Sequence, residues 1–250
     1  MSIGMLKSDC VRIVVGVAAI VSRYSLKYVR LVQWYLLDHY PHPFQRIYVD
    51  PAKIQTYGGR FTNNPYRYGG RFSLAYYAGA TVRGGRWDRD TECVTGSAKY
   101  NAVFDRYEHG CRWEETGIYD EISERAARTG SYDGCTTRDD IERRYERIDA
   151  LYERIKAEGY EDDGSLDQVC VNIGRDGEIM FNGNGNHRLF IAKVLGIREI
   201  PVRVLVRHER WMHKRKQFVD ERAADAESEV HAVRADHPDL QDLAPRERTD

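Results

Sequence analysis

The sequence has almost no excess of either charge, because its 250 residues carry 38 lysines and arginines against 39 aspartates and glutamates. The net charge of −1 gives no global basic field of the kind that drives non-specific binding to nucleic acid. Such binding would need a local basic patch. Hydrophobic residues still make up 42% of the chain, which is enough to bury a core in one large domain or in one domain with attachments.

Cysteine is also sparse. The five cysteines are an odd number, and none forms a CxxC pair or a Cys/His pair at metal-ligand spacing. This pattern favours reduced thiols in an intracellular protein over a disulfide framework. Cys93, Cys111 and Cys135 lie in one region, and the sequence leaves open whether a metal binds there.

The chain lacks a hydrophobic run long enough to cross a bilayer. Its most apolar stretch, residues 11–21, contains Arg12 and is 11 residues long, whereas a membrane-spanning helix needs about 20 residues. No small-residue cleavage site follows, so a secretory signal is not indicated. We therefore expect a cytoplasmic protein without a membrane partner, in which this run is a buried strand or the start of a core helix.

Apolar periodicity and turn residues predict both helices and strands. A cap at Thr137 begins a long helix, Arg138 to Glu158, whose charged residues, including Arg144 and Arg147, are expected to face solvent. Tyrosines and leucines at three- and four-residue spacing predict a helix over 22–40. Further helices are expected at 99–107 and 113–125, strands at 46–50, 169–173, 178–181 and 200–206, and a hairpin turn at 174–177.

Two segments do not fit this pattern. Residues 57–90 are rich in Gly, Tyr and Arg, and a Gly-Gly pair followed by Arg and an aromatic residue occurs three times. Arg and aromatic faces suit phosphates and stacked bases, while a loop-rich extension with locally packed tyrosines explains them equally well. Residues 207–218 are basic and amphipathic, and residues 220–250 are polar, which predicts a frayed helix and a flexible tail.

The stretch FNGNGNHRLF, residues 181–190, places small turn-forming residues between a strand and a helix. The start of such a helix presents unpaired N–H groups and a positive dipole end. Glycines allow the backbone to wrap an anion, and the planar guanidinium of arginine matches phosphate. Histidine is able to bind the same anion or to shuttle a proton. We predict a phosphate- or nucleotide-binding site formed by Gly183, Asn184, Gly185, Asn186, His187 and Arg188.

Structural roles for the same residues stay open. Gly-Asn turns are common in hairpins, and a histidine at a helix start often caps the helix or packs against it. Asp167 and Glu178 are candidates for an ion pair with Arg188. The complete string is therefore more informative than any of its parts.

The string DGEIMFNGNGNHRLFIAKVLGIREIPVRVLVRH, residues 176–208, resembles the core of the ParB/sulfiredoxin-like superfamily. There a strand, a Gly-x-His-Arg or Gly-Glu-Arg-Arg turn, an Ala-containing helix, a Leu-Gly pair and an Ile-Pro-Val strand follow one another. The residues that match in order and spacing are Gly185, His187, Arg188, Ala192, Leu195, Gly196, Ile200, Pro201 and Val202. The resemblance is to the ParB N-terminal-like domain and covers mainly residues 141–208, with a weaker match at 46–56.

The resemblance implies an α+β fold, in which a ParB/sulfiredoxin-like core combines a small mixed sheet with helices. The implied domain spans residues 43–208 and contains a large insertion at about 57–140. An N-terminal helical segment at 1–42 precedes it, and a basic helix with a flexible polar C-terminal tail at 209–250 follows it.

The branches of this superfamily imply different chemistry. Sulfiredoxins carry a catalytic cysteine directly before the His-Arg pair, where this chain has Asn186, so repair of sulfinylated cysteine is not expected. Partition proteins of the ParB type bind cytidine triphosphate through a Glu-Arg-Arg turn and read DNA with a helix-turn-helix. Here Arg188 is retained, but no complete DNA-reading domain follows Val206. Small-molecule kinases use a similar His-Arg turn for nucleotide phosphates and a separate carboxylate as base.

Two functions therefore stay open for a nucleotide- or phosphate-binding protein. One is a phosphoryl-transfer or phosphodiester-acting enzyme, kinase-like or nuclease-like, that uses a nucleoside triphosphate and Mg²⁺. The other is a non-catalytic, nucleotide-gated module that binds DNA or a protein, which the basic segment 208–216 with Trp211 favours. The catalytic candidates are His187, Asp88, Glu114 and Glu115, and the sequence determines neither the choice among the carboxylates nor the oligomeric state.

Overall fold

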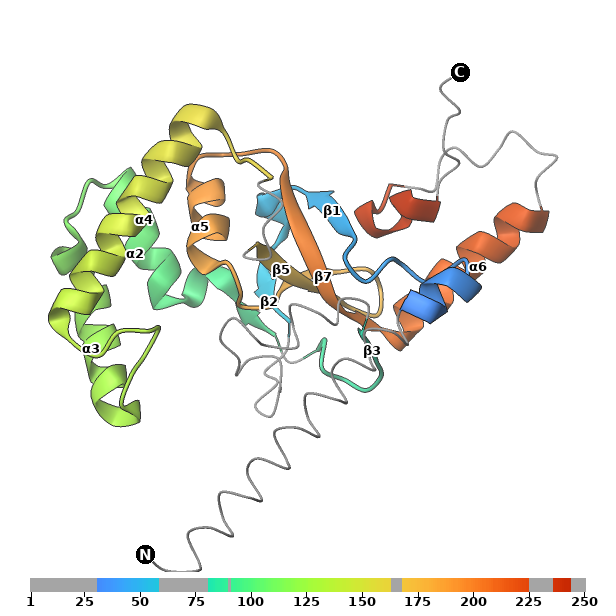
Figure 1. Cartoon of the computed structure of the whole chain (residues 1–250), viewed down its shortest axis with the longest axis horizontal. Helices are drawn as coiled ribbons and strands as arrows, with labels where there is room; N and C mark the ends of the chain where they lie inside the picture. The colour runs from blue at the N-terminus through green and yellow to red at the C-terminus, as the bar shows by residue number, and fades with distance from the viewer. Residues whose placement is uncertain (1–30, 59–80, 90, 163–167, 225–235, 244–250) are drawn as a thin grey trace, which may run out of the picture. The chain divides into compact units, whose positions relative to one another are not determined.

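The computed structural model describes residues 31–58, 81–89, 91–162, 168–224 and 236–243 (Figure 1). They form two compact units. The first contains the described residues of Met1–Gln45, Phe61–Gly85 and Val204–Asp250, and the second contains those of Arg46–Arg60 and Arg86–Arg203. This division differs from the predicted boundaries, because strand β7 (Ile200–His208) contributes residues to both units. In the described part of the chain no helix is long and apolar enough to span a membrane.

A small mixed sheet forms the centre of the second unit, and it confirms an α+β fold. Its strands are β1 (Arg46–Val49), β2 (Thr56–Tyr57), β4 (Glu92–Cys93), β5 (Val169–Ile173), β6 (Ile179–Phe181) and the first part of β7, in the order β1-β7-β5-β6-β2-β4. β5 and β6 form the predicted antiparallel hairpin, with Val171 opposite Phe181. β2 pairs with β6 in parallel, and β1 pairs with β7 antiparallel.

Four helices accompany this sheet: α2 (Ala98–Glu108), α3 (Ile118–Thr129), α4 (Arg138–Glu158) and α5 (Asn186–Val194). Both α2 and α4 pack against α5 (Figure 1). The predicted start of α4 is confirmed, because the hydroxyl of Thr137 accepts from the N–H of Asp140, whose carboxylate accepts from the N–H of Thr137. These caps and contacts fix the orientation of the α4 face next to α5.

The helix predicted over 113–125 is divided in two. A 3₁₀ turn, η4 (Trp113–Thr116), is followed by α3, and Gly117 between them has φ +72°. A left-handed residue cannot continue a right-handed helix, so the direction of the chain changes at this glycine. The apolar pattern alone did not reveal this break.

The first unit is built from the second part of β7 and the segments around it. β3 (Thr81–Arg83) pairs with β7 in parallel, and β7 leads into α6 (Glu209–Ala224). Residues 31–36 are helical, as predicted, while residues 1–30 lie outside the described part. The 3₁₀ helix η6 (Pro238–Leu243) corrects the prediction of a flexible tail there, because its Asp239 is buried and paired with Arg207.

The insertion expected at about 57–140 is not a single module. β3 belongs to the first unit, whereas β4, the 3₁₀ turn η3 (Val94–Gly96), α2 and α3 belong to the second. Residues 59–80, which carry most of the Gly-Gly-Arg repeats, lie outside the described residues. Among the described parts of the insertion, the α2 and α3 region is the part that builds up the helical side of the second unit.

Candidate functional site

The Gly/Asn-rich turn joins β6 to α5 and is tied to the neighbouring strand β5. The N–H of Asn182 donates to the carbonyl of Cys170 at 2.9 Å, and the N–H of Cys170 donates to the carbonyl of Asn184 at 3.1 Å. The side chain of Asn186 donates to the carbonyl of Gly183 at 2.7 Å. The turn is therefore held in one conformation before the helix begins.

Two glycines make this conformation accessible. Gly183 and Gly185 have φ values of +100° and +82°, which are unfavourable for any residue that carries a Cβ atom. A Cβ at Gly185 would lie 2.8 Å from the Cα of Val169, whereas nothing lies within 4 Å of the corresponding position at Gly183. Two constraints therefore require glycine at position 185: its backbone angle and the close approach of β5.

The turn leaves backbone donors unused at the start of α5. Gly185 is the N-cap, so Asn186 and His187 are the first helical residues. Within the described part of the chain, the N–H groups of Asn184, Gly185 and Asn186 donate to no acceptor. Together with the positive end of the helix dipole, these groups favour an anion at this place.

A hollow of about 390 Å³ opens at the turn. Its wall combines the start of α5, one face of α4 and the loop before α4. The lining residues are Asp133, Arg144, Arg147, Ile148, Leu151, Gly183, Asn184, Gly185, Asn186, His187 and Arg188. All six residues predicted from the sequence therefore line one hollow, and three guanidinium groups share it with one carboxylate.

Arg144 and Arg147 are the residues that the sequence analysis missed. Both were predicted to face solvent, because they lie outside the apolar stripe of the long helix. In the structure they line the hollow together with Arg188 of α5. Their three-residue spacing puts them on one helix face, but only the packing of α4 against α5 turns this face toward the glycine turn.

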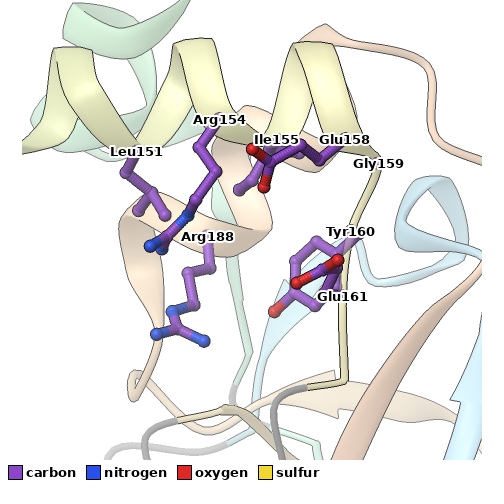
Figure 2. A pocket seen from close by; sticks show the side chains of 8 residues that line it. All are labelled: Leu151, Arg154, Ile155, Glu158, Gly159, Tyr160, Glu161 and Arg188. Atoms are coloured by element: carbon purple, nitrogen blue, oxygen red, sulfur yellow. The ribbon is translucent and has the colours of Figure 1, made fainter.

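Arg188 also borders a second, smaller hollow of about 80 Å³. Figure 2 shows its side chain on the same side of this hollow as Leu151 and Arg154 of α4, with Tyr160 and Glu161 across from it. Arg188 therefore lines both hollows, as does Leu151. Arg154 adds a further cation to the α4 face that runs along α5.

His187 does not have the surroundings of a proton shuttle. Its imidazole packs edge-on against Tyr145, with ring centroids 5.8 Å apart, and its Nε2 is shielded from solvent and has no hydrogen-bond partner among the described residues. Burial, followed by the charges of Lys99 and Arg144, lowers its pKa to about 3. The imidazole is therefore neutral near pH 7. It forms part of the wall of the hollow and adds no positive charge to it.

The three carboxylates considered as catalytic bases lie outside the lining of the hollow. Asp88 is buried and accepts hydrogen bonds from the backbone N–H and the Nε of Arg175, at 2.9 and 2.7 Å. Glu115 accepts from the backbone N–H of Arg112 at 2.7 Å, which caps η4. Glu114, its neighbour, is exposed. Local structural duties therefore account for Asp88 and Glu115, and the geometry does not support the expected catalytic role of any of the three.

The hollow also lacks the donors of a magnesium site. Mg²⁺ prefers several oxygen ligands, and among the described residues the lining contains one carboxylate, Asp133, which is paired with Lys99 and Arg144. Across the described residues, no group of three His, Cys, Asp or Glu side chains is able to hold a metal ion. Cys93, Cys111 and Cys135 are free thiols. The described lining residues therefore do not supply the oxygen ligands that Mg²⁺ bound by the protein alone would need.

A separate hollow of about 630 Å³ lies at the other end of α5 and is lined by Cys93 and Lys193, among others. Cys93 is exposed, and its Sγ lies 3.0 Å from the hydroxyl of Thr95. This hydrogen bond lowers the pKa of the thiol. Cys135 and Cys170 are buried, and burial raises the pKa of Cys135.

We expect iodoacetamide to alkylate Cys93 at least about tenfold faster than Cys135 or Cys170 in the native protein, because the thiolate is the nucleophile and must be accessible. Peptide mass spectrometry after timed quenching measures the three rates. Unfolding in urea should make the rates similar, and equal rates without urea would contradict the burial of the two slower thiols.

Comparison of the chain with models of protein families, with curated proteins and with solved structures found no match.

Proposed function

We propose that the chain binds the phosphate of a nucleotide or of a phosphodiester in the hollow at the start of α5. One observation carries this proposal: unpaired N–H groups of the glycine turn and the arginines Arg144, Arg147 and Arg188 line the same hollow. Phosphate oxygens accept hydrogen bonds from both kinds of donor. If the turn were only a structural connection and the α4 arginines only faced solvent, the two groups of donors would have no reason to line the same hollow.

The charge around the hollow supports a ligand with more than one negative charge. The carboxylate of Asp133 pairs with both Lys99 and Arg144, with Nζ–Oδ2 and Nη2–Oδ2 distances of 2.7 and 2.9 Å. The imidazole of His187 is neutral. The described lining then holds three arginines against one carboxylate, and this excess of positive charge suits a phosphate dianion or a short polyphosphate better than a single carboxylate.

The order of elements agrees with the ParB/sulfiredoxin-like pattern that we propose for this core. Strand β6, the glycine turn, α5 and β7 follow one another in the chain, and Leu195 and Gly196 end the helix. In that superfamily the corresponding turn contacts phosphate. The proposed function does not depend on this resemblance, because the donors and charges of the hollow lead to it independently.

We favour binding without catalysis over phosphoryl transfer, since the contacts of Asp88 and Glu115 commit these carboxylates elsewhere. We also favour a nucleotide over DNA. Trp211 and Arg215 of the basic segment are 5% and 0% exposed, and Arg215 pairs with Asp242. Trp211, the aromatic side chain that would stack on a base, therefore belongs to the interior of the first unit, whereas Arg210, Lys214 and Lys216 of the same segment are exposed.

Replacing Arg188 by alanine is expected to weaken binding by roughly 1.5–3 kcal/mol, or about 10- to 150-fold in Kd, because a charge-assisted contact is lost. Isothermal titration calorimetry with each of the four nucleoside triphosphates and with inorganic pyrophosphate measures the effect. Arg147→Ala should act in the same direction. Arg143→Ala is the matched control, because this exposed arginine of the same helix pairs with Asp140 and does not line the hollow.

Two outcomes would contradict the assignment. One is that none of the five probes binds to the wild-type protein. The other is that Arg188→Ala and Arg143→Ala bind the tightest probe equally well. Phosphoryl transfer is tested separately, with Mg²⁺ and a small hydroxyl-bearing acceptor: nucleoside diphosphate that appears only with the acceptor would favour the enzyme over the binding module.

A further inference from the structure

The wall of the hollow includes a tight turn that the sequence analysis did not use. Tyr132 and Cys135 exchange backbone hydrogen bonds of 3.0 and 2.9 Å, and Asp133 and Gly134 form the two residues between them. Their φ values are +58° and +80°, which is the type I′ geometry that Asp-Gly pairs favour. Asp133 of this turn is one of the residues that line the hollow.

One of the two oxygens of the Asp133 carboxylate is bonded to neighbouring side chains. Its Oδ2 accepts from Nζ of Lys99 at 2.7 Å and pairs with Nη2 of Arg144 at 2.9 Å. Its Oδ1 has no hydrogen-bond partner in the described part of the chain. Burial alone would raise the pKa of this carboxyl, but the charges of Lys99 and Arg144 outweigh burial and lower it. Asp133 is therefore ionised near pH 7, with one acceptor oxygen to spare.

The surroundings of this oxygen select the kind of group that it accepts. A phosphate would meet a like charge at Oδ1. An ammonium group would meet the charges of Lys99 and Arg144, which already neutralise the carboxylate. A neutral hydroxyl avoids both repulsions, and a hydroxyl donating to an ionised oxygen makes a strong hydrogen bond. The hollow thus offers anion donors on α4 and α5 and a hydroxyl acceptor on the Asp-Gly turn.

We propose that Asp133 is a specificity-determining contact whose Oδ1 accepts a hydrogen bond from a hydroxyl group of a phosphate ester bound in the hollow. The ligand class is a hydroxylated phosphate ester, such as a polyol phosphate or the sugar phosphate part of a nucleotide. This inference rests on the proposed function, because the α5 turn and the arginines hold the phosphate of the same ligand. Asp133 then distinguishes this ester from an equally charged ester without hydroxyl groups.

Glycerol 3-phosphate and n-propyl phosphate are suitable probes, because they have the same chain length and differ in their hydroxyl groups. We expect the wild-type protein to bind glycerol 3-phosphate about tenfold more tightly, the scale of one charge-assisted hydrogen bond. Asp133→Asn should remove this preference. In the variant the amide oxygen must face Lys99 and Arg144, so the NH₂ group, which cannot accept a hydrogen bond, faces the hollow.

We expect this variant to keep the fold, since Asn-Gly is a favoured pair for a type I′ turn. Its affinity for n-propyl phosphate should stay equal or rise, because a negative charge has been removed from the hollow. Asp120→Asn, at an exposed carboxylate of α3 outside the lining, is the control and should keep the tenfold preference. Thermal unfolding of each variant verifies that it is folded.

The titrations separate this inference from the proposed function. Suppose that Arg188→Ala weakens the binding of both probes. If the wild type then shows no preference for glycerol 3-phosphate, or if Asp133→Asn keeps this preference, the role of Asp133 is overturned and the phosphate site stands. If neither probe binds to the wild type, or Arg188→Ala weakens neither, the proposed phosphate site fails and the inference fails with it.

Discussion

Replacing Gly185 by alanine is expected to destabilise the second unit by about 2–5 kcal/mol and to abolish phosphate binding. The left-handed backbone at φ +82° costs an alanine about 1–2 kcal/mol. The added methyl group costs about 1–3 kcal/mol more, because it would meet the Cα and N atoms of Val169 at 2.8 and 3.0 Å. These are backbone atoms of a buried strand, so they cannot rotate away as a side chain would.

Gly183 provides the matched control for this prediction. It also has a positive φ, +100°, but nothing lies within 4 Å of an added Cβ. Gly183→Ala should therefore cost only the backbone term of about 1–2 kcal/mol. Urea unfolding followed by circular dichroism compares the two variants, and calorimetry with pyrophosphate reports the site. Equal stability of the two variants would show that β5 does not approach Gly185 as closely as described.

Replacing Asp239 by asparagine is expected to destabilise the first unit by about 3–5 kcal/mol, because it leaves buried charges without their partner. Asp239 is 0% exposed, and it pairs with Arg207 and Arg215, which are 1% and 0% exposed. The indole N–H of Trp211 donates to the same carboxylate at 2.8 Å. Asp242→Asn is the control, since among the described residues Asp242 forms an ion pair with Arg215 alone and its side chain is 25% exposed.

The same carboxylate predicts how stability depends on pH. Burial alone would raise the pKa of Asp239, but the charges of Arg207 and Arg215 and the hydrogen bond from Trp211 lower it to about 2, compared with 3.8 for a free aspartate. A lowered pKa stabilises the fold fully above pH 4, and the contribution is lost as the pH falls from about 4 to 2. Urea unfolding between pH 2 and 5 measures this loss. Asp239→Asn should flatten this part of the curve, and an unchanged slope would contradict the buried pairing.

The Gly185 and Asp239 predictions both concern contacts within the interior of a unit, but only Gly185 belongs to the candidate ligand site. In the second unit, Gly185 lets the turn close against β5 so that its N–H groups remain available. In the first unit, Asp239 neutralises arginines of the segment that looked like a basic nucleic-acid surface. Arginine thus serves a candidate ligand site in one unit and internal stability in the other.

Local elements followed from the sequence because their causes are local. The Thr137 cap and the apolar stripe predicted α4 at its observed bounds, and alternating turn and β-branched residues predicted the β5 and β6 hairpin. The glycine turn before α5 was also foreseen, since only glycine tolerates its backbone angles. Where a local signal was misread, as at Gly117, the break came from a single left-handed residue inside an apolar pattern.

Long-range pairing decided the rest. Asp88 lies 87 positions from Arg175, and Asp239 lies 32 positions from Arg207, so neither pair leaves a periodic trace in the sequence. The sequence by itself determined helix α4 with its Thr137 cap, the β5 and β6 hairpin and the glycine-rich turn before α5, because the geometry of each depends on neighbouring residues. Only the tertiary structure decided that Arg144, Arg147 and Asp133 line the hollow at that turn, because the packing of α4 against α5 selects which polar face meets it.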